Sequence, residues 1–164
     1  MLILDEYETT DIALETAQGN PISNVQCREI SLYNRALFGN LEKKYGEYIE
    51  KRVEPSAIYN CHGLVFASRR TAIESSVEVT KILRDDNYIR IMETNVRPGD
   101  IIVYFDDGGD PEHSGIVIEP PTREHLMVPW VLSKWGCYAE VLHLANQCPY
   151  QFNKAVYYRA DVRL

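Results

Sequence analysis

Apolar residues in the first third of the chain recur every three or four positions, with charged residues between them. The recurring positions are Tyr33, Leu37, Leu41, Tyr45 and Tyr48. Because this spacing places them on one side of an α-helix, the pattern predicts an amphipathic helix over residues 31–53. Pro55 then ends it, since proline cannot continue a helix.

Two shorter helices are expected after this one. Asn60 is a favourable N-cap residue, because its side-chain oxygen can accept a hydrogen bond from a backbone N–H of the first helical turn. A helix is therefore predicted from Cys61 to about Arg70. The next stretch, residues 72–85, again carries apolar residues at helical spacing and predicts a third helix.

From Tyr88 onward the pattern changes from helix to strand. "YIRIM" alternates apolar and polar residues, and "RPGD" is typical of a turn. Five later stretches also predict strands, namely "IIVYF", "HSGIVIE", "MVPWVLSKW", "AEVLHL" and "AVYYRA". Pro129 places its strand at a sheet edge or a bulge, because proline lacks the backbone N–H donor. Helices followed by strands predict an α+β fold, with an antiparallel sheet packed against the Cys61 helix.

The length of the chain favours one domain. Its 164 residues, 45% of them hydrophobic, can form one substantial core and are too few for two comfortable ones. We therefore expect a single domain over residues 1–164, in which residues 1–55 form an N-terminal helical extension or a lid.

The net charge changes the expected partners. A formal charge of −7 disfavours attraction to phosphate backbones, so nucleic acid is not an expected partner. The opening "MLILDEYETTDIAL" lacks the basic segment of a signal peptide, and no later run reaches the length of a membrane span. A cytoplasmic location is expected, with export by another route as the alternative and no membrane association; the oligomeric state is left open.

The cysteines do not form a disulfide or metal pattern. Cys27, Cys61, Cys137 and Cys148 show no CxxC spacing, so reduced thiols are the simplest expectation. The spacing of Cys137, His143 and Cys148 matches no familiar zinc site, and "DDGGD" lacks the ligand spacing of a calcium loop. No metal or cofactor is therefore expected.

One cysteine lies where a reactive thiol would be placed. A thiol in the first turn of a helix is near the positive end of the helix dipole, which lowers its pKa and favours the nucleophilic thiolate. His113 opens a predicted strand and is the best candidate for the base that Cys61 would need. The alternative is a buried structural thiol, since free cysteines are often buried.

The segments "NCHGLV", "PGDIIVYF" and "HSGIVIE" occur in an order that resembles the NlpC-type papain-like cysteine hydrolases. The same order is also similar to that of the CHAP amidases. This resemblance covers roughly residues 59–135. It implies a papain-like α+β core, with Cys61 as the nucleophile and His113 as the general base. The residue after the nucleophile is usually small in these families, whereas this chain has His62.

In such hydrolases a third residue, on the strand after the histidine, orients the imidazole. No residue of the usual kind lies at the matching point, where Ser133 is the nearest candidate because its hydroxyl oxygen can accept a hydrogen bond. Lys134 would point to the opposite face of the strand. Glu140, His143 or a backbone carbonyl group are the alternatives for this role.

Three further residues are candidates for contacts with the substrate. His62 either narrows the substrate pocket or lies at the surface, because it points about 100° away from Cys61 on a helix. Tyr59 would offer its hydroxyl to an oxyanion, as the resemblance implies, or pack in the core. Trp135 would line a substrate groove, or pack in the core as aromatic residues beside a sheet usually do.

Together, these features predict a cysteine peptidase or amidase that acts on amide or isopeptide bonds of a peptide, protein or peptidoglycan-like substrate, in a bacterial or phage setting. Acyl transfer and deamidation use the same thioester intermediate and stay open. A non-catalytic module that binds a peptide or partner on a papain-like shell is the competing class. The missing third residue favours the binding module, whereas the Cys61 and His113 pair favours the enzyme.

Overall fold

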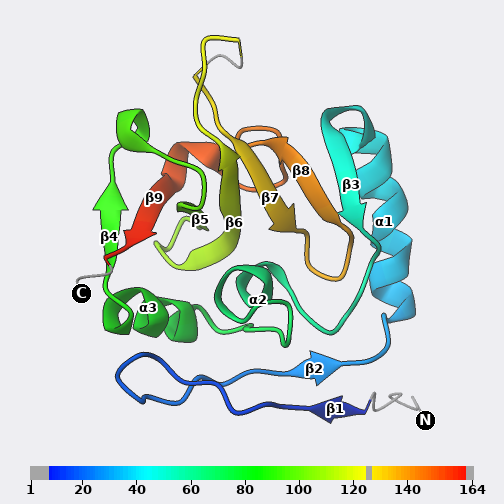
Figure 1. The fold of residues 1–164 in the computed structure, drawn as a ribbon. Coiled ribbons are helices and arrows are strands. Elements are labelled where there is room, and N and C mark those ends of the chain that lie inside the picture. Colours follow the sequence, from blue (N-terminus) through cyan, green and yellow to red (C-terminus); the bar gives the residue numbers. More distant parts are fainter. Residues whose placement is uncertain (1–7, 125–126, 162–164) are drawn as a thin grey trace.

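The chain folds into an α+β arrangement of three helices and a seven-strand antiparallel sheet, which confirms the predicted fold class at this level (Figure 1). The computed structural model describes residues 8–124 and 127–161. The expected domain and N-terminal extension also included residues 1–7 and 162–164, which lie outside the described residues. The strand order in the sheet is β3-β8-β7-β6-β5-β9-β4.

The elements follow one another in a mixed order along the chain. The helices are α1 (Leu32–Tyr45), α2 (Cys61–Phe66) and α3 (Ser76–Asp85). The strands of the large sheet are β3 (Ile49–Val53), β4 (Tyr88–Ile91), β5 (Ile101–Phe105), β6 (Pro111–Glu119), β7 (Trp130–Lys134), β8 (Glu140–Leu144) and β9 (Ala155–Ala160). Two short strands, β1 (Thr9–Thr10) and β2 (Gln26–Cys27), pair separately, and single 3₁₀ turns form η1 (Gly46–Tyr48), η2 (Glu93–Asn95) and η3 (Phe152–Lys154).

The predicted helix over residues 31–53 is wrong in its last part. Helix α1 ends at Tyr45, and after η1 the chain extends into β3, which pairs with β8 at the edge of the sheet. Most residues of β3 are exposed, and three of its five residues are charged. Such a sequence is equally compatible with the solvent-facing side of a helix. Pairing with β8, which is distant in sequence, decides the conformation.

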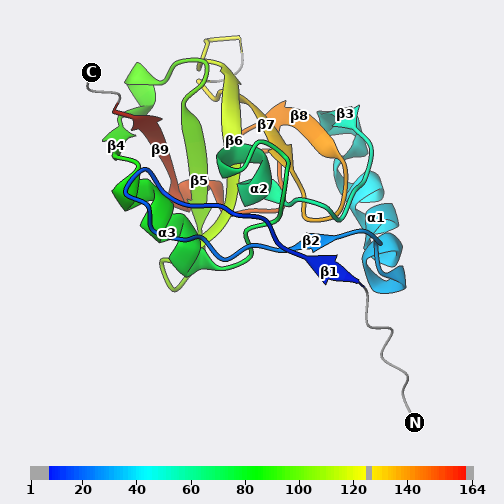
Figure 2. The ribbon, with the colours of Figure 1, turned by 60° about the horizontal axis from the view of Figure 1, so that its bottom comes forward.

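Within the expected N-terminal extension or lid of residues 1–55, residues 8–27 form a strap without a helix, and α1 follows them. The strap runs across α2 and α3, as Figure 2 shows from below. The buried carboxylate of Asp85 anchors it by accepting hydrogen bonds from Thr16 Oγ1 at 3.0 Å and Asn20 Nδ2 at 2.7 Å. Backbone bonds between Val25 and Ala72 hold its other end. The strap is therefore fastened at two places by residues far away in sequence.

Each face of the sheet has its own hydrophobic cluster. Ile101 and Val103 of β5 pack with α3 and with Ala67 at the end of α2. Their neighbours Ile102 and Tyr104 point to the opposite face, because side chains alternate along a strand. That second cluster is completed by residues of β7, β8 and the loop between them, and α1 packs partly against it.

Pro129 predicted that its strand lies at a sheet edge or a bulge, and the sheet-edge prediction is wrong. Strand β7 lies between β6 and β8 in the interior of the sheet, and Pro129 precedes its first residue. The pairing of β6 with β7 does shift in register between Val117 and Glu119, close to this proline. Among the described residues, no helix is long and apolar enough to cross a membrane.

Candidate functional site

Cys61 is the first residue of α2, and Asn60 holds this helix start in place. The Asn60 side chain accepts a hydrogen bond from the Gly63 N–H at 2.9 Å, as expected of an N-cap residue. The same oxygen accepts from the Ile73 N–H, and Asn60 Nδ2 donates to the Ile73 carbonyl at 2.8 Å. Asn60 therefore fixes the position of Cys61 relative to the segment that leads into α3.

Two glycines, Gly63 in α2 and Gly115 in β6, allow close packing of the chain. A Cβ atom on Gly63 would lie 1.9 Å from the carbonyl oxygen of Thr71. On Gly115 it would lie 2.4 Å from a Val131 methyl group. These contacts require glycine, because heavy atoms cannot approach so closely. The glycines of "CHG" and "HSG" therefore have a packing role.

The Cys61 thiol is buried, with only 6% of the residue exposed. Burial raises the pKa of Cys61 to about 11, although nearby backbone N–H groups of Ser114, His62 and Cys61 itself favour the thiolate. The expectation of a lowered thiol pKa is therefore wrong for this state of the protein. Desolvation of the thiolate outweighs the contribution of a helix that has only six residues.

His113 is fully buried on β6. Its imidazole stacks on the ring of Tyr150, with centroids 3.7 Å apart and planes at 7°, and also lies beside Tyr104. Neither ring nitrogen has a hydrogen-bond partner among residues 8–124 and 127–161. Burial, with smaller contributions from the charges of His143 and His62, lowers the pKa of His113 well below its ordinary value. The imidazole is therefore neutral at physiological pH.

The structure brings the Cys61 thiol to the backbone next to His113 but not into a hydrogen bond with the imidazole. The thiol lies near the backbone N–H of Ser114, the residue that follows His113. The Ser114 side chain faces α2, where its hydroxyl oxygen lies 2.8 Å from His62 Nδ1. Since neighbours in a strand point to opposite faces, this contact and the stack of His113 on Tyr150 lie on opposite sides of β6.

His62 is buried, so the expectation of a surface position is wrong. It contacts Ser114 as described, and burial lowers its pKa to about 4. A neutral, buried imidazole beside a buried hydroxyl group stabilises the packing of α2 on β6.

Ser133 contacts a different histidine from the one expected. Its hydroxyl lies 2.7 Å from His143 Nε2 and accepts a hydrogen bond from Trp135 Nε1 at 3.1 Å. His143 Nδ1 lies 2.8 Å from the Leu144 carbonyl, which can only accept, so Nδ1 carries the proton and Nε2 accepts from Ser133. All three side chains of this group, Ser133, His143 and Trp135, are buried. Trp135 therefore belongs to the core, where it also contacts Tyr45 edge to face.

Glu140 and Tyr59 belong to a buried cluster beside α2. Tyr59 donates a hydrogen bond to Glu140 Oε1 at 2.5 Å. Arg69 binds the same carboxylate through Nε at 2.5 Å and through a terminal nitrogen at 3.1 Å. Burial opposes ionisation of Glu140, but these hydrogen bonds outweigh it and lower its pKa. The Tyr59 hydroxyl is thus engaged, and no described residue occupies the third role beside His113.

Lys134 is a buried cation that the sequence did not reveal as important. Its ammonium group donates to the carbonyl oxygens of Ser56, Gly136 and Tyr138, at 2.8, 2.8 and 2.5 Å. Burial lowers its pKa to about 8. These bonds join the loop after β7 to the segment that leads into α2. A lysine that follows "VLS" in a strand gives no sequence signal of this contact.

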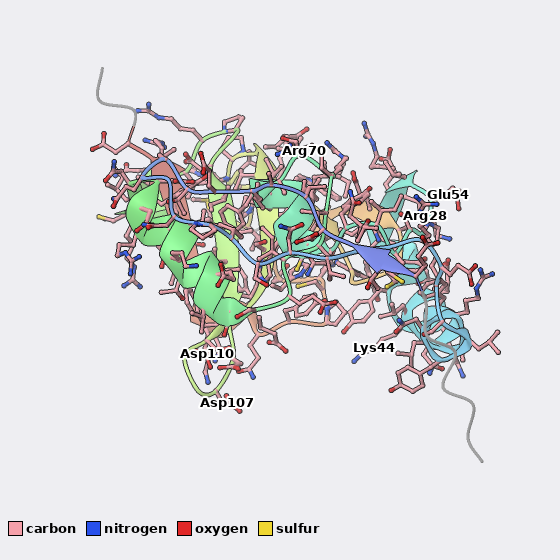
Figure 3. The ribbon with its side chains drawn as sticks, turned by 90° about the horizontal axis from the view of Figure 1, so that it is seen from below. Arg28, Lys44, Glu54, Arg70, Asp107 and Asp110 are labelled. Carbon is pink, nitrogen blue, oxygen red and sulfur yellow. The ribbon has the colours of Figure 1, made fainter. Side chains whose placement is uncertain are left out.

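A pocket of about 360 Å³ opens beside the start of α2. Tyr59 and Asn60, the two residues before Cys61, line it, together with Gly136 and Cys137 of the loop after β7. Val25 and other residues from the end of the strap and beyond it also line the pocket. Figure 3 shows this lower side of the molecule, where the strap crosses in front of α2 and α3.

The described residues contain no group of three or more histidine, cysteine, aspartate or glutamate side chains able to hold a metal ion. In the comparisons with known proteins, no family model, no curated protein and no solved structure matches this chain.

Proposed function

We propose that this protein is a cysteine hydrolase of amide or isopeptide bonds, with Cys61 as the nucleophile and His113 as the general base. The observation that carries the proposal is the buried imidazole of His113, which has no hydrogen-bond partner among the described residues and precedes the amide group that faces the Cys61 thiol. Buried imidazole nitrogens normally have partners. One left without a partner is expected where the group has chemistry to perform.

The order of the elements gives further support. A helix that begins at Cys61 packs against β6, the strand that carries His113. A papain-like hydrolase needs a thiol at a helix start beside a histidine on an antiparallel sheet. Gly63, in the motif that contains Cys61, allows α2 to approach the Thr71 backbone closely, which ties this motif to the packing of the site.

In the proposed reaction, the neutral imidazole of His113 accepts the thiol proton while the Cys61 sulfur attacks the carbonyl carbon. The backbone N–H of Cys61 helps to hold the developing oxyanion. The imidazolium then protonates the leaving amine as the C–N bond breaks and a thioester forms. Water, deprotonated by His113, attacks the thioester, releases the acid and restores the thiol.

The described state is a closed resting state of this enzyme. The thiol is protonated because its pKa is raised, and the ring of Tyr150 covers His113. Because His113 lies on the face of β6 opposite to α2, catalysis requires the imidazole to turn toward α2 as well as Tyr150 to move, so that the imidazole, the thiol and a substrate carbonyl meet. Hydrogen bonds between catalytic groups are often absent before the substrate binds and form in the complex.

Hydrolysis of a panel of peptides, isopeptides and peptidoglycan fragments tests the proposal. Cys61→Ala should abolish turnover, and His113→Ala should reduce kcat/KM by about 10²–10⁴-fold, the usual contribution of a general base. Cys148→Ala is the matched control, because Cys148 is also a buried thiol but packs in the hydrophobic cluster with Tyr104 and has no part in the proposed reaction. Undiminished turnover by Cys61→Ala would refute the assignment.

A non-catalytic binding module is the second candidate. The burial of both the Cys61 thiol and the His113 imidazole favours it. A thiol with a raised pKa and an unsupported imidazole are also expected of a shell that has lost its activity. Absence of turnover on the whole panel, with Cys61→Ala and the unaltered protein binding the same peptides equally, would favour this class. Acyl transfer or deamidation would be recognised from the products.

A further inference from the structure

Lys134 points toward α2, the helix that begins with the proposed nucleophile and packs against β6 and β7 (Figure 2). Strands β6 and β7 pair Gly115 with Ser133. The next residues along this ladder, Ser114 and Lys134, therefore lie side by side and point to one face of the sheet. That face is the one covered by α2, because the Ser114 hydroxyl contacts His62.

The ammonium group of Lys134 lies against the segment that leads into Cys61. Its Nζ atom lies 5.1 Å from the centre of the Tyr59 ring and donates to the Ser56 carbonyl at 2.8 Å. The Cys61 thiol lies near the backbone N–H of Ser114, the neighbour of Lys134 in the sheet. Burial raises the pKa of Cys61, and the charge of Lys134 opposes this rise. The buried cation and the thiol therefore lie close enough to interact.

Lys134 is a buried cation without an anionic partner of its own. Within residues 8–124 and 127–161 it forms no ion pair, and its three hydrogen bonds go to neutral carbonyl groups. Glu140 lies opposite it on β8, but Arg69 binds both oxygens of that carboxylate and balances its charge. Buried charges are normally paired, so an anion that forms beside Lys134 would be stabilised.

We propose that the ammonium group of Lys134 is a fixed positive charge that stabilises the thiolate of Cys61. The inference rests on the proposed function, in which His113 takes the thiol proton and leaves a negative charge on the sulfur. Because all three N–H groups of Lys134 donate to carbonyl oxygens, the cation is held in place while the thiolate forms. Burial lowers the pKa of Lys134 to about 8, so the group is still protonated at neutral pH. Lys134 thus acts through Cys61 and carries no proton of the reaction.

The rate of Cys61 alkylation tests this charge without requiring turnover. Lys134→Met has a side chain of similar length without the charge, so the pKa of Cys61 should rise further. Iodoacetamide, a neutral reagent, should then modify Cys61 at pH 9 at least about tenfold more slowly than in the unaltered protein. A merely structural role predicts the opposite, because loss of three hydrogen bonds would loosen the site and speed the reaction. Cys148, in the cluster on the other face of the sheet, is the internal control and should keep its rate.

A second pair of variants keeps Lys134 in place and decides the question if Lys134→Met does not fold. Cys61→Asp puts a negative charge where the thiolate would form, and Cys61→Asn has the same shape without the charge. The pKa of Lys134, followed by NMR of its Cε–H signals, should be at least about one unit higher in Cys61→Asp than in Cys61→Asn.

Equal or faster alkylation of Cys61 in folded Lys134→Met, or the same Lys134 pKa in the Asp and Asn variants, would overturn the proposal. Neither readout uses turnover. Lys134 can therefore fail this test while Cys61 is still the nucleophile, and the interaction can be found in a protein that does not hydrolyse amides.

Discussion

The imidazole of His113 lies flat against the ring of Tyr150, at 3.7 Å between centroids. His113 is fully buried, whereas Tyr150 is only partly so, and Tyr150 therefore covers the histidine. Tyr150→Leu should remove this cover and raise the pKa of His113 toward its ordinary value of 6.5, because water would then solvate the imidazolium. The pH titration of the imidazole carbon-bound protons by NMR measures this, with His113→Asn to assign the signal.

Tyr150→Phe is the matched control for this stack. Phenylalanine keeps the aromatic ring over His113, so the histidine should stay neutral across the same pH range. Identical titration of His113 in the Tyr150→Leu and unaltered proteins would show that Tyr150 does not control access to the imidazole.

The four thiols should differ in their rate of alkylation. Cys27 is half-buried, whereas Cys61 and Cys148 are buried and have raised pKa values. Because the thiolate is the reacting form, iodoacetamide at pH 8 should modify Cys27 at least about tenfold faster than Cys61. The rate at Cys61 should rise as the pH approaches 11, where burial has placed its pKa. Peptide mapping gives the order, and a Cys61 that reacted first would show that the site is open without substrate.

Gly63 should tolerate no side chain. A Cβ atom there would meet the Thr71 carbonyl oxygen at 1.9 Å, and this backbone atom cannot move without displacing the segment before α3. Gly63→Ala should therefore lower the free energy of unfolding by about 3 kcal/mol. In contrast, Gly39 lies within α1 with open space around it, so Gly39→Ala should raise the free energy of unfolding by about 0.5–1 kcal/mol. Urea unfolding of both variants checks the pair, and equal effects would contradict it.

The protein should lose stability in mild acid. Burial lowers the pKa of both His62 and His143 from 6.5 to about 4, so the unfolded chain binds protons between these values and the folded chain does not. Stability is therefore present above pH 6.5 and falls as the pH drops toward 4. The loss should approach about 1.4 kcal/mol per pH unit for each such histidine. Urea unfolding between pH 7.5 and 5 measures it, and a constant free energy of unfolding would refute it.

Much of the fold could be predicted because its signals are local. The strands from β5 onward can be predicted from apolar runs between turns, and the start of α2 can be predicted from the N-cap residue Asn60. The strap could not be predicted, since it depends on side chains such as Asp85 that are far from Thr16 in sequence. Strand β3 was mistaken for helix because its exposed charged residues have no periodicity of their own, and only pairing with β8 makes them a strand.

The sequence predicted which elements carry the candidate site, but not the contacts of its side chains. The sequence placed Cys61 at a helix start and His113 on a strand of the sheet that packs on it. Burial of the Cys61 thiol was the alternative expectation, whereas burial of His113 could not be predicted because it depends on the distant residue Tyr150. Because the thiol is buried, its pKa changed in the opposite direction to that expected. Ser133 was found beside His143 rather than His113.

The role of Cys61 as a nucleophile is tested most directly by trapping the thioester. The protein is mixed with the panel of peptides and peptidoglycan fragments, quenched in acid during turnover and analysed by intact-protein mass spectrometry with peptide mapping. We expect a mass increase equal to the acyl part of a substrate, located on Cys61, absent from Cys61→Ala and greatly reduced in His113→Ala. An adduct on Cys27, Cys137 or Cys148 instead, or no adduct on Cys61 with any member of the panel, would contradict the proposed mechanism.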